Sequence, residues 1–190
     1  VSKMAQLLEE NYIGRLRKIE LMMRFPQWPR DFQQSSWINS REQGGFVFEV
    51  AGHYIQLIER FFGKIKTVNS VLEYPENKES AEIGILSMMQ LENEVPVLFS
   101  GISETYGEEM EHVTLTMYGT EGTLMLENLF TLKGAKNGEN LDILEAREDR
   151  QFWDEMITNV IHAIEGKEAT VFDFNIGVYV QEVLEQFREG

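Results

Sequence analysis

Residues 43–63 (QGGFVFEVAGHYIQLIERFFG) constrain the fold more than any other stretch of the chain. Two glycines, Gly44 and Gly45, open the stretch, Gly63 closes it, and apolar residues between them recur at spacings of three and four. This periodicity predicts a helix that is apolar around most of its circumference and that ends at a glycine suited to positive φ. Such a helix is buried against other elements, so we expect it to cross the middle of a domain.

Glu49 and His53 lie four residues apart in this stretch, and therefore on the same face of the predicted helix. A carboxylate beside an imidazole can take part in proton transfer, because histidine titrates near neutral pH. The same spacing is also typical of a core histidine paired with a carboxylate for structural reasons. The spacing alone leaves both interpretations open.

Charge and composition exclude several classes of function. The 190 residues include 17 basic and 32 acidic side chains, giving a net charge of −15, which argues against binding to nucleic acid or to an anionic membrane surface. The absence of cysteine excludes disulfides, thiol catalysis and zinc–thiolate sites. The three histidines form no metal-ligand pattern, so we expect no metal site. No signal peptide or membrane span is visible, and we expect a cytoplasmic protein.

The rest of the chain is dominated by strand patterns. Helical periodicity predicts helices over residues 2–12, 150–165 and 175–188. Alternating or β-branched runs predict strands over residues 15–25, 64–74, 79–92, 96–104, 111–118, 123–127 and 130–133, with one more at 141–146 after a turn over 134–140. This order predicts one α+β domain: a large, mostly antiparallel open sheet with helices covering one face. Apolar residues on the open face would favour an oligomer.

A loop over residues 26–40 follows the first strand and is rich in proline, tryptophan and polar residues. Two tryptophans, Trp28 and Trp37, lie within it together with Arg30, and Arg24 and Arg41 flank it. Aromatic surfaces and cationic donors of this kind can line a pocket for a polar ligand. An alternative interpretation is that aromatic anchors pin the loop to the body of the domain.

The segment GGFVFEVAGH (residues 44–53) resembles the G-G-x-x-x-D-x-G-x-H segment of the Gfo/Idh/MocA oxidoreductases, relatives of glucose–fructose oxidoreductase and inositol dehydrogenase. Three further stretches resemble this family in order and spacing. They are residues 11–14 (NYIG), similar to its G-x-I-G entry into the second domain; residues 118–124 (YGTEGTL), similar to its G-T-E-G-x-L turn; and the two helices from residue 152 onward, similar to its closing helix pair. Together these stretches extend over essentially all of the chain.

The resemblance is only to the C-terminal half of those enzymes, whose first half is a nucleotide-binding Rossmann domain. The chain has no G-x-G-x-x-G turn and no E-K-P motif with its catalytic lysine. The resemblance therefore implies that residues 1–13 are a linker helix after an absent Rossmann domain. Residues 14–190 then form the C-terminal α/β substrate-binding and oligomerisation domain. NAD or NADP is expected in the parent protein, bound mainly by the absent domain, and none for this chain alone.

By the same resemblance, His53 handles the proton of a substrate hydroxyl and Glu49 takes the place of the family's aspartate. Ala51 replaces the glycine between them, and Gln56 replaces an acidic residue often found after the histidine. The implied substrate is a sugar- or polyol-like small molecule, with the loop residues as substrate-binding candidates: Trp37, Arg41, Trp28 and Arg24.

The implied function is that of a substrate-binding and oligomerisation domain of an NAD(P)-dependent oxidoreductase acting on a CH–OH group. We expect the chain by itself to be inactive and to form a homo-oligomer through the open sheet face. The departures from the family motif also support an alternative, a non-catalytic dimerisation or ligand-binding module derived from that family.

Overall fold

A computed structural model describes residues 2–77, 79–107 and 109–189. Its centre is an eight-stranded sheet in the order β2-β3-β4-β1-β5-β6-β7-β8. The strands are β1 (Leu16–Arg24), β2 (Ile65–Glu73), β3 (Gly84–Leu91), β4 (Pro96–Ile102), β5 (His112–Gly119), β6 (Gly122–Glu127), β7 (Thr131–Lys136) and β8 (Asp142–Ala146). Among these described strands, β1 and β4 alone pair in parallel, and the other pairs are antiparallel. The predicted α+β class with a mostly antiparallel open sheet is confirmed.

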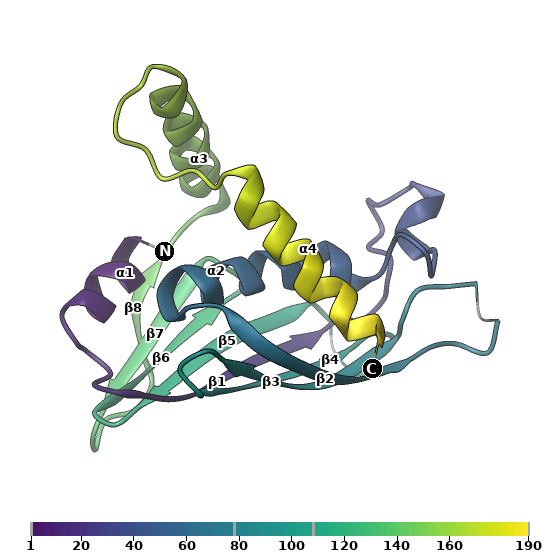
Figure 1. The fold of residues 1–190 in the computed structure, drawn as a ribbon, viewed down its shortest axis with the longest axis horizontal. Helices are drawn as coiled ribbons and strands as arrows, with labels where there is room; N and C mark the ends of the chain where they lie inside the picture. Colours follow the sequence, from purple (N-terminus) through teal and green to yellow (C-terminus); the bar gives the residue numbers. More distant parts are fainter. Residues whose placement is uncertain (1, 78, 108, 190) are drawn as a thin grey trace.

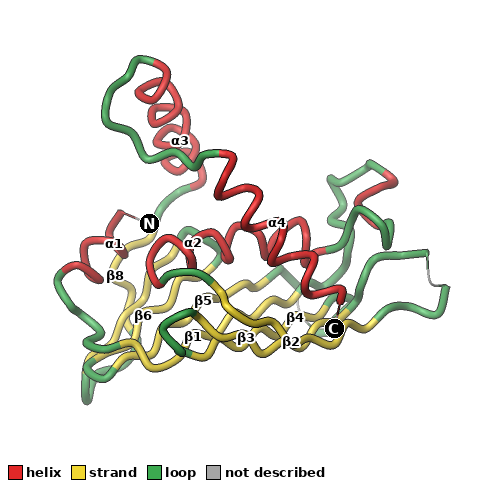
Figure 2. Tube along the Cα trace, viewed as in Figure 1, coloured by secondary structure: helices red, strands yellow, loops and turns green. Residues whose placement is uncertain are grey.

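Helices lie over one face of this sheet (Figure 1, Figure 2). The described helices are α1 (Ser2–Glu9), a 3₁₀ turn (Ser36–Asn39), a π-helical turn (Val47–Ala51), α2 (Gly52–Phe62), α3 (Asp149–Ile164) and α4 (Phe174–Glu189). In Figure 1, α2 and α4 cross the sheet and α3 projects away from it. No helix among the described residues is long and apolar enough to cross a membrane.

The two faces of the sheet differ because side chains alternate along each strand. In β1, Ile19, Leu21 and Met23 are buried under the helices, whereas the residues between them face outward. The outward face of β2, β3 and β4 exposes a patch of large apolar side chains: Val71, Leu86, Met88, Leu98 and Ile102. The sequence predicted an oligomer if the open face of the sheet carried apolar residues, and this patch shows that it does.

The predicted central helix is present, and it begins earlier than Glu49, with a π-helical turn at Val47. Its two opening glycines are required by close packing. A Cβ on Gly44 would lie 2.1 Å from the carbonyl oxygen of Ile38, and one on Gly45 would lie 2.2 Å from a carboxylate oxygen of Glu82. Glu82 itself is buried, and its Oε1 accepts a hydrogen bond from the Val47 N–H at 2.8 Å. The carboxylate therefore holds the first turn of this helix in place.

Two boundaries predicted from the sequence are wrong. The turn expected to begin at Gly134 is part of β7, because Gly134 is paired with Leu124 on one side and Asp142 on the other. The strand expected from residue 79 begins only at Gly84. Glycine and polar residues favour turns locally, but pairing with neighbouring strands overrides that preference.

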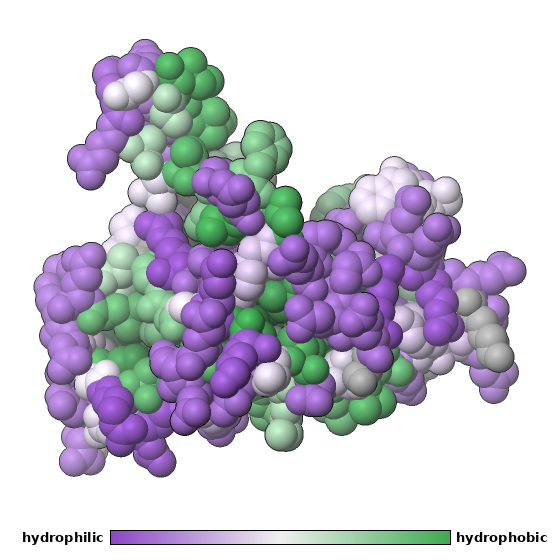
Figure 3. All heavy atoms as spheres, viewed as in Figure 1, coloured by the Kyte–Doolittle hydropathy of each residue, from purple (hydrophilic) through white to green (hydrophobic). Residues whose placement is uncertain are grey.

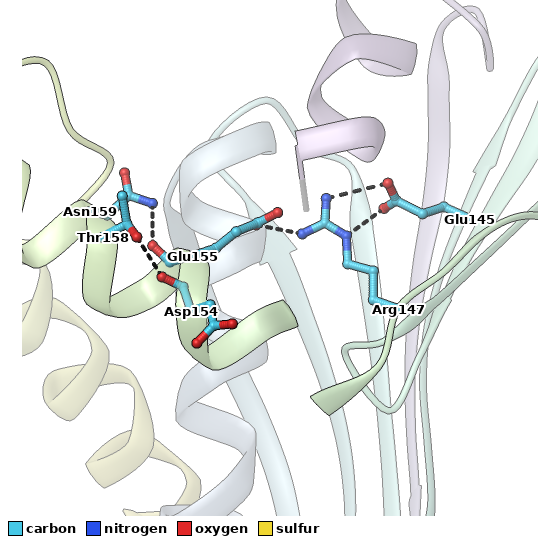
Figure 4. A network of polar contacts seen from close by, with 6 residues as sticks. All are labelled: Glu145, Arg147, Asp154, Glu155, Thr158 and Asn159. Atoms are coloured by element: carbon cyan, nitrogen blue, oxygen red, sulfur yellow. Dashed lines mark hydrogen bonds and ion pairs between the residues drawn. The ribbon is translucent and has the colours of Figure 1, made fainter. Parts of the chain in front are cut away.

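The projecting helix α3 is joined to β8 through Arg147 (Figure 4). The guanidinium bonds to Glu145 through Nε at 3.0 Å and to Glu155 on α3 through Nη1 at 2.6 Å. Apolar side chains gather on α3 and on the start of α4 (Figure 3). The exposed ones include Trp153, Ile157, Ile161, Ile164 and Phe174.

Candidate functional site

A cavity of 190 Å³ opens beside the start of α2. The helix contributes one wall, the loop after β1 contributes Arg30, and β5 with the β6–β7 turn contributes the remainder. The lining residues are Arg30, Glu49, Val50, His53, Tyr54, Glu111, Val113, Asn128, Leu129 and Phe130. The cavity therefore brings together side chains from four separate segments of the chain.

His53 and Glu49 both line this cavity, as their shared helical face predicts. Burial lowers the pKa of His53; the charge of Glu49 acts in the opposite direction and that of Arg30 in the same direction. No hydrogen bond joins the Glu49 and His53 side chains in the described part of the chain, so Glu49 acts on the imidazole through its charge. The lowered pKa keeps His53 neutral at neutral pH, the form that accepts a proton.

Arg30 is the cation of the cavity and is held from several sides. Its Nε donates to Glu111 Oε2 at 2.5 Å. Its guanidinium carbon lies 5.1 Å from the ring centre of Trp28 and 5.4 Å from that of Phe25, distances at which a cation interacts with an aromatic ring. The backbone N–H of Arg30 also donates to Gln33 Oε1 at 3.0 Å. These contacts fix the guanidinium beside His53.

Tyr54 forms the buried part of the wall and is only 2% exposed. Burial raises the pKa of Tyr54, the charge of Glu111 raises it further, and that of Arg30 opposes both. The phenol is therefore un-ionised at all physiological pH values and remains able to donate its proton in a hydrogen bond.

The β6–β7 turn closes the cavity with Leu129 and Phe130. Asn128 and Leu129 both have positive φ, at 49° and 66°, and the Phe130 N–H donates to the Glu127 carbonyl at 3.0 Å. This is the geometry of a two-residue hairpin turn. The side chain of Asn128 accepts a hydrogen bond from the Val113 N–H at 2.8 Å, which ties the turn to β5. A leucine in the left-handed conformation is strained by about 1–2 kcal/mol.

The two tryptophans proposed from the sequence as substrate-binding residues lie elsewhere. Trp28 is buried against Phe25 and Phe46, with ring centres 5.4 and 6.2 Å away, and its Nε1 donates to the Ile38 carbonyl at 3.3 Å. It lines a second cavity of 250 Å³ that also contains Glu82. Trp37, in the 3₁₀ turn, is 45% exposed. Neither is among the described residues that line the His53 cavity, and their role in binding substrate stays a prediction.

The two arginines proposed with them are also separate from that cavity. Arg24 ends β1 and is exposed. Arg41 stacks on Tyr74, with its guanidinium carbon 3.7 Å from the ring centre. The cavity instead receives Arg30 from the same loop, together with Glu111 from 81 residues further along the chain. The arginines in and beside this loop indicated that a cation could line a pocket. No sequence pattern around Glu111 predicts that it lies in the same cavity.

The described residues offer no cluster of three or more histidine or acidic side chains that could hold a metal ion. They also do not fit a nicotinamide dinucleotide by themselves. The chain has no G-x-G-x-x-G turn, and the single parallel pair in the described sheet is not the βαβ unit that cradles a pyrophosphate.

The family model of the GFO/IDH/MocA C-terminal domain matches residues 1–125, which include the helix that carries Glu49 and His53. The chain belongs to the GFO/IDH/MocA family. The resemblance stated from the sequence is thus confirmed for the C-terminal domain. No curated protein matches the chain.

Solved structures with the same fold include several oxidoreductases. Levoglucosan dehydrogenase in complex with NADH and L-sorbose superposes with a TM-score of 0.80 at 16% identity, covering 97% of this chain and 58% of that one. A putative oxidoreductase from Thermotoga maritima gives 0.77 at 18% identity, with 99% and 56% coverage. KijD10, a 3-ketoreductase from Actinomadura kijaniata in complex with NADP, gives 0.76 at 16% identity, with 100% and 58% coverage. The chain thus spans less than two thirds of the length of these relatives.

Proposed function

We propose that this chain is the substrate-binding and oligomerisation domain of an NAD(P)-dependent oxidoreductase acting on the CH–OH group of a sugar- or polyol-like substrate. The observation that carries the proposal is the cavity in which a neutral His53 lies beside Glu49 and Arg30. Family membership and the named dehydrogenase and ketoreductase relatives support the same class of reaction.

In this proposal His53 is the base for the substrate hydroxyl. Oxidation of a carbinol breaks its C–H and O–H bonds, and the hydroxyl proton passes to an imidazole nitrogen of His53. The charge of Glu49 raises the pKa of His53, so it favours the imidazolium that forms. In the reverse direction the imidazolium returns the proton to the carbonyl oxygen.

The nicotinamide belongs to a different domain in this proposal, since the residues of this chain do not fit it. NADH accompanies levoglucosan dehydrogenase and NADP accompanies the 3-ketoreductase KijD10, and the nucleotide supplies the hydride chemistry when it is bound. Residues 1–13 are then the connection to that domain. Met4 and Leu7 of α1 are buried in the same core as α2, so this connection is packed on the domain that it introduces.

The open face of the sheet is the proposed oligomer interface. The exposed apolar side chains on β2, β3 and β4 are neighbours, because Val71 pairs with Leu86 and Met88 pairs with Leu98, and contiguous apolar patches are typical of association surfaces. A second copy of the chain on this face would bury the patch against its own equivalent.

A longer form of the protein that includes residues upstream of Val1 provides the test. We expect it to bind NADH or NADPH in a fluorescence titration in which the 190-residue chain serves as the control. His53→Ala in that longer form is expected to lower kcat by about 10²–10⁴-fold with nucleotide binding unchanged. Full activity of the variant would rule out His53 as the base.

The alternative function is a ligand-binding or dimerisation module without catalysis. It is favoured by Glu49 in place of the family's aspartate. This alternative predicts that neither the longer form nor the 190-residue chain binds NADH or NADPH.

A further inference from the structure

Arg188, in the last turn of α4, carries a buried polar atom that has no partner. Its Nη2 is the one buried side-chain nitrogen or oxygen without a hydrogen bond in the part of the chain that the structure describes. A buried charged donor without an acceptor is costly, so an unsatisfied group of this kind calls for an explanation. The other contacts of the same guanidinium supply one.

Those other contacts converge on the beginning of the site helix. The Nη1 of Arg188 donates to the Glu42 carbonyl at 2.8 Å. Its guanidinium carbon lies 3.8 Å from the ring centre of Phe48, a distance at which a cation stacks on an aromatic face. Glu42 precedes Gly44 and Gly45, and Phe48 follows them in the π-helical turn. Arg188 therefore holds the chain on both sides of the two glycines.

Arg188 extends from a backbone that is itself fixed to the sheet. The preceding residue, Phe187, is 1% exposed, and its ring centre lies 5.5 Å from that of Phe99 in β4. The Phe187 carbonyl accepts a hydrogen bond from the Ser70 hydroxyl of β2 at 2.7 Å. The end of α4 is thus anchored to two strands, and the guanidinium connects this anchor to the site helix.

The π-helical turn is held at two consecutive residues. Glu82 accepts the Val47 N–H at 2.8 Å, and Arg188 stacks on Phe48. Burial raises the pKa of Glu82, and the charge of Arg188 is among the influences that oppose this rise, so the two side chains stabilise each other electrostatically. Glu49 is the next residue of the turn, and its side chain lines the His53 cavity. Single π-helical turns of this kind occur frequently at functional sites.

We propose that Arg188 is a positioning residue of the His53 site, which holds Glu42 and Phe48 and thereby fixes the turn from which Glu49 reaches the cavity. Arg188 is not among the described residues that line this cavity, so it acts through the turn alone. This inference rests on the proposed function, because that function assigns Glu49 and His53 to proton transfer.

The experiment is an NMR titration of the His53 imidazole in the 190-residue chain and in Arg188→Met. Methionine keeps an apolar side chain of similar length against Phe48 and removes the donor and the charge. Arg188→Lys is the conservative variant, because lysine keeps a cation and a donor for the Glu42 carbonyl. Arg17→Met removes an equal charge from an exposed position in β1 and is the matched control.

The sign of the change distinguishes positioning from a simple loss of charge. The titratable and charged residues that line the cavity with His53 are Arg30, Glu49, Tyr54 and Glu111. Burial lowers the pKa of His53, and the charge of Glu49 opposes this. If Arg188→Met lets the Glu49 carboxylate move away, the pKa of His53 falls. Removing the positive charge of Arg188 would by itself raise that pKa, so a fall requires displacement of Glu49.

We therefore expect Arg188→Met to lower the pKa of His53, and Glu49→Gln sets the largest fall that it can cause. In the Glu49→Gln background, Arg188→Met should cause no further fall, because no carboxylate remains to be displaced. Arg188→Lys and Arg17→Met should leave the pKa close to that of the unmodified chain. If Arg188→Met does not fold, Phe48→Leu removes the other half of the stacking contact and should lower the pKa in the same way.

The outcomes separate this inference from the proposed function. An unchanged or raised pKa of His53 in folded Arg188→Met would overturn the positioning role and leave His53 as the proposed base. An equal fall with and without Glu49→Gln would also overturn it, since the effect would then be a general loosening of the domain. Full activity of His53→Ala in the longer form contradicts the proposed base, and it does not change how Arg188 holds the turn.

Discussion

Glu82 provides a quantitative test of how the site helix is held. Its Oε1 accepts the Val47 N–H at 2.8 Å, and the residue is 2% exposed. Glu82→Ala leaves a buried N–H without its acceptor, which costs about 1–3 kcal/mol of unfolding free energy. Glu82→Gln keeps a carbonyl oxygen at the same place and removes only the charge. We therefore expect the alanine variant to be clearly less stable than the glutamine variant.

Because the Glu82 carboxyl group titrates, its contribution to the stability of the fold depends on pH. Burial raises the pKa of Glu82, although hydrogen bonds from the Val47 N–H and its own N–H, and the charge of Arg188, act in the opposite direction. A carboxyl group whose pKa is higher in the folded than in the unfolded state binds more protons when folded. Its contribution to stability is then greatest below the unfolded pKa of about 4.5 and is lost as pH rises through the folded pKa.

Urea denaturation followed by tryptophan fluorescence is the assay, at pH 5 and pH 8. Relative to Glu82→Gln, which does not titrate, the unmodified chain should be more stable at pH 5 than at pH 8. Glu82→Ala should be the least stable protein at both pH values. The reasoning would be refuted if Glu82→Gln were as unstable as Glu82→Ala, or if the difference between the glutamine variant and the unmodified chain were independent of pH.

Four further predictions follow from the site and the sheet. The pKa of His53 measured by NMR should lie below its ordinary 6.5, and Arg30→Gln should raise it, because the cation lowers it; an unchanged value in the variant would contradict the proximity of Arg30. Leu129→Gly should be about 1 kcal/mol more stable than Leu129→Ala in urea denaturation, because φ is +66°; the opposite order would contradict strain in the turn. Light scattering should show that the chain self-associates at micromolar concentration, and Leu86→Glu, at an exposed site on the open sheet face, should weaken the self-association. An unmodified chain that is monomeric at this concentration would rule out the proposed interface on the open face. The 190-residue chain with NAD(P) and a polyol should show no dehydrogenase activity, and any turnover would refute the prediction that the nucleotide site lies elsewhere.

Local patterns determined the elements of this domain. The spacing of apolar residues in 43–63 predicted the site helix, and alternation along the chain predicted the strands of the sheet. These signals are reliable because a helix or strand with one buried face repeats its apolar residues at its own period. The same period placed Glu49 and His53 on one face, and both line the cavity.

Only the tertiary structure decided which other residues surround that pair. Glu111 accepts a hydrogen bond from Arg30, although the two residues are 81 positions apart in the sequence. The strand pairing that brings them together depends on contacts along the whole sheet. Tyr54 is adjacent to His53 in sequence, but its burial depends on the packing of α2 over the sheet. The sequence of Gly44 and Gly45 suggested a tight turn before the helix. Both positions require glycine because the 3₁₀ turn and Glu82 approach the backbone closely there, and these contacts appear only in the folded structure.

The sequence by itself therefore determined the fold class, the family and the placement of Glu49 and His53 on one helical face, because these depend on local periodicity and on a short motif. The tertiary structure decided the composition of the cavity, the partners of Arg30 and the identity of the open apolar face. Those features arise from residues far apart in the chain, and no spacing within a single segment encodes the contacts between them.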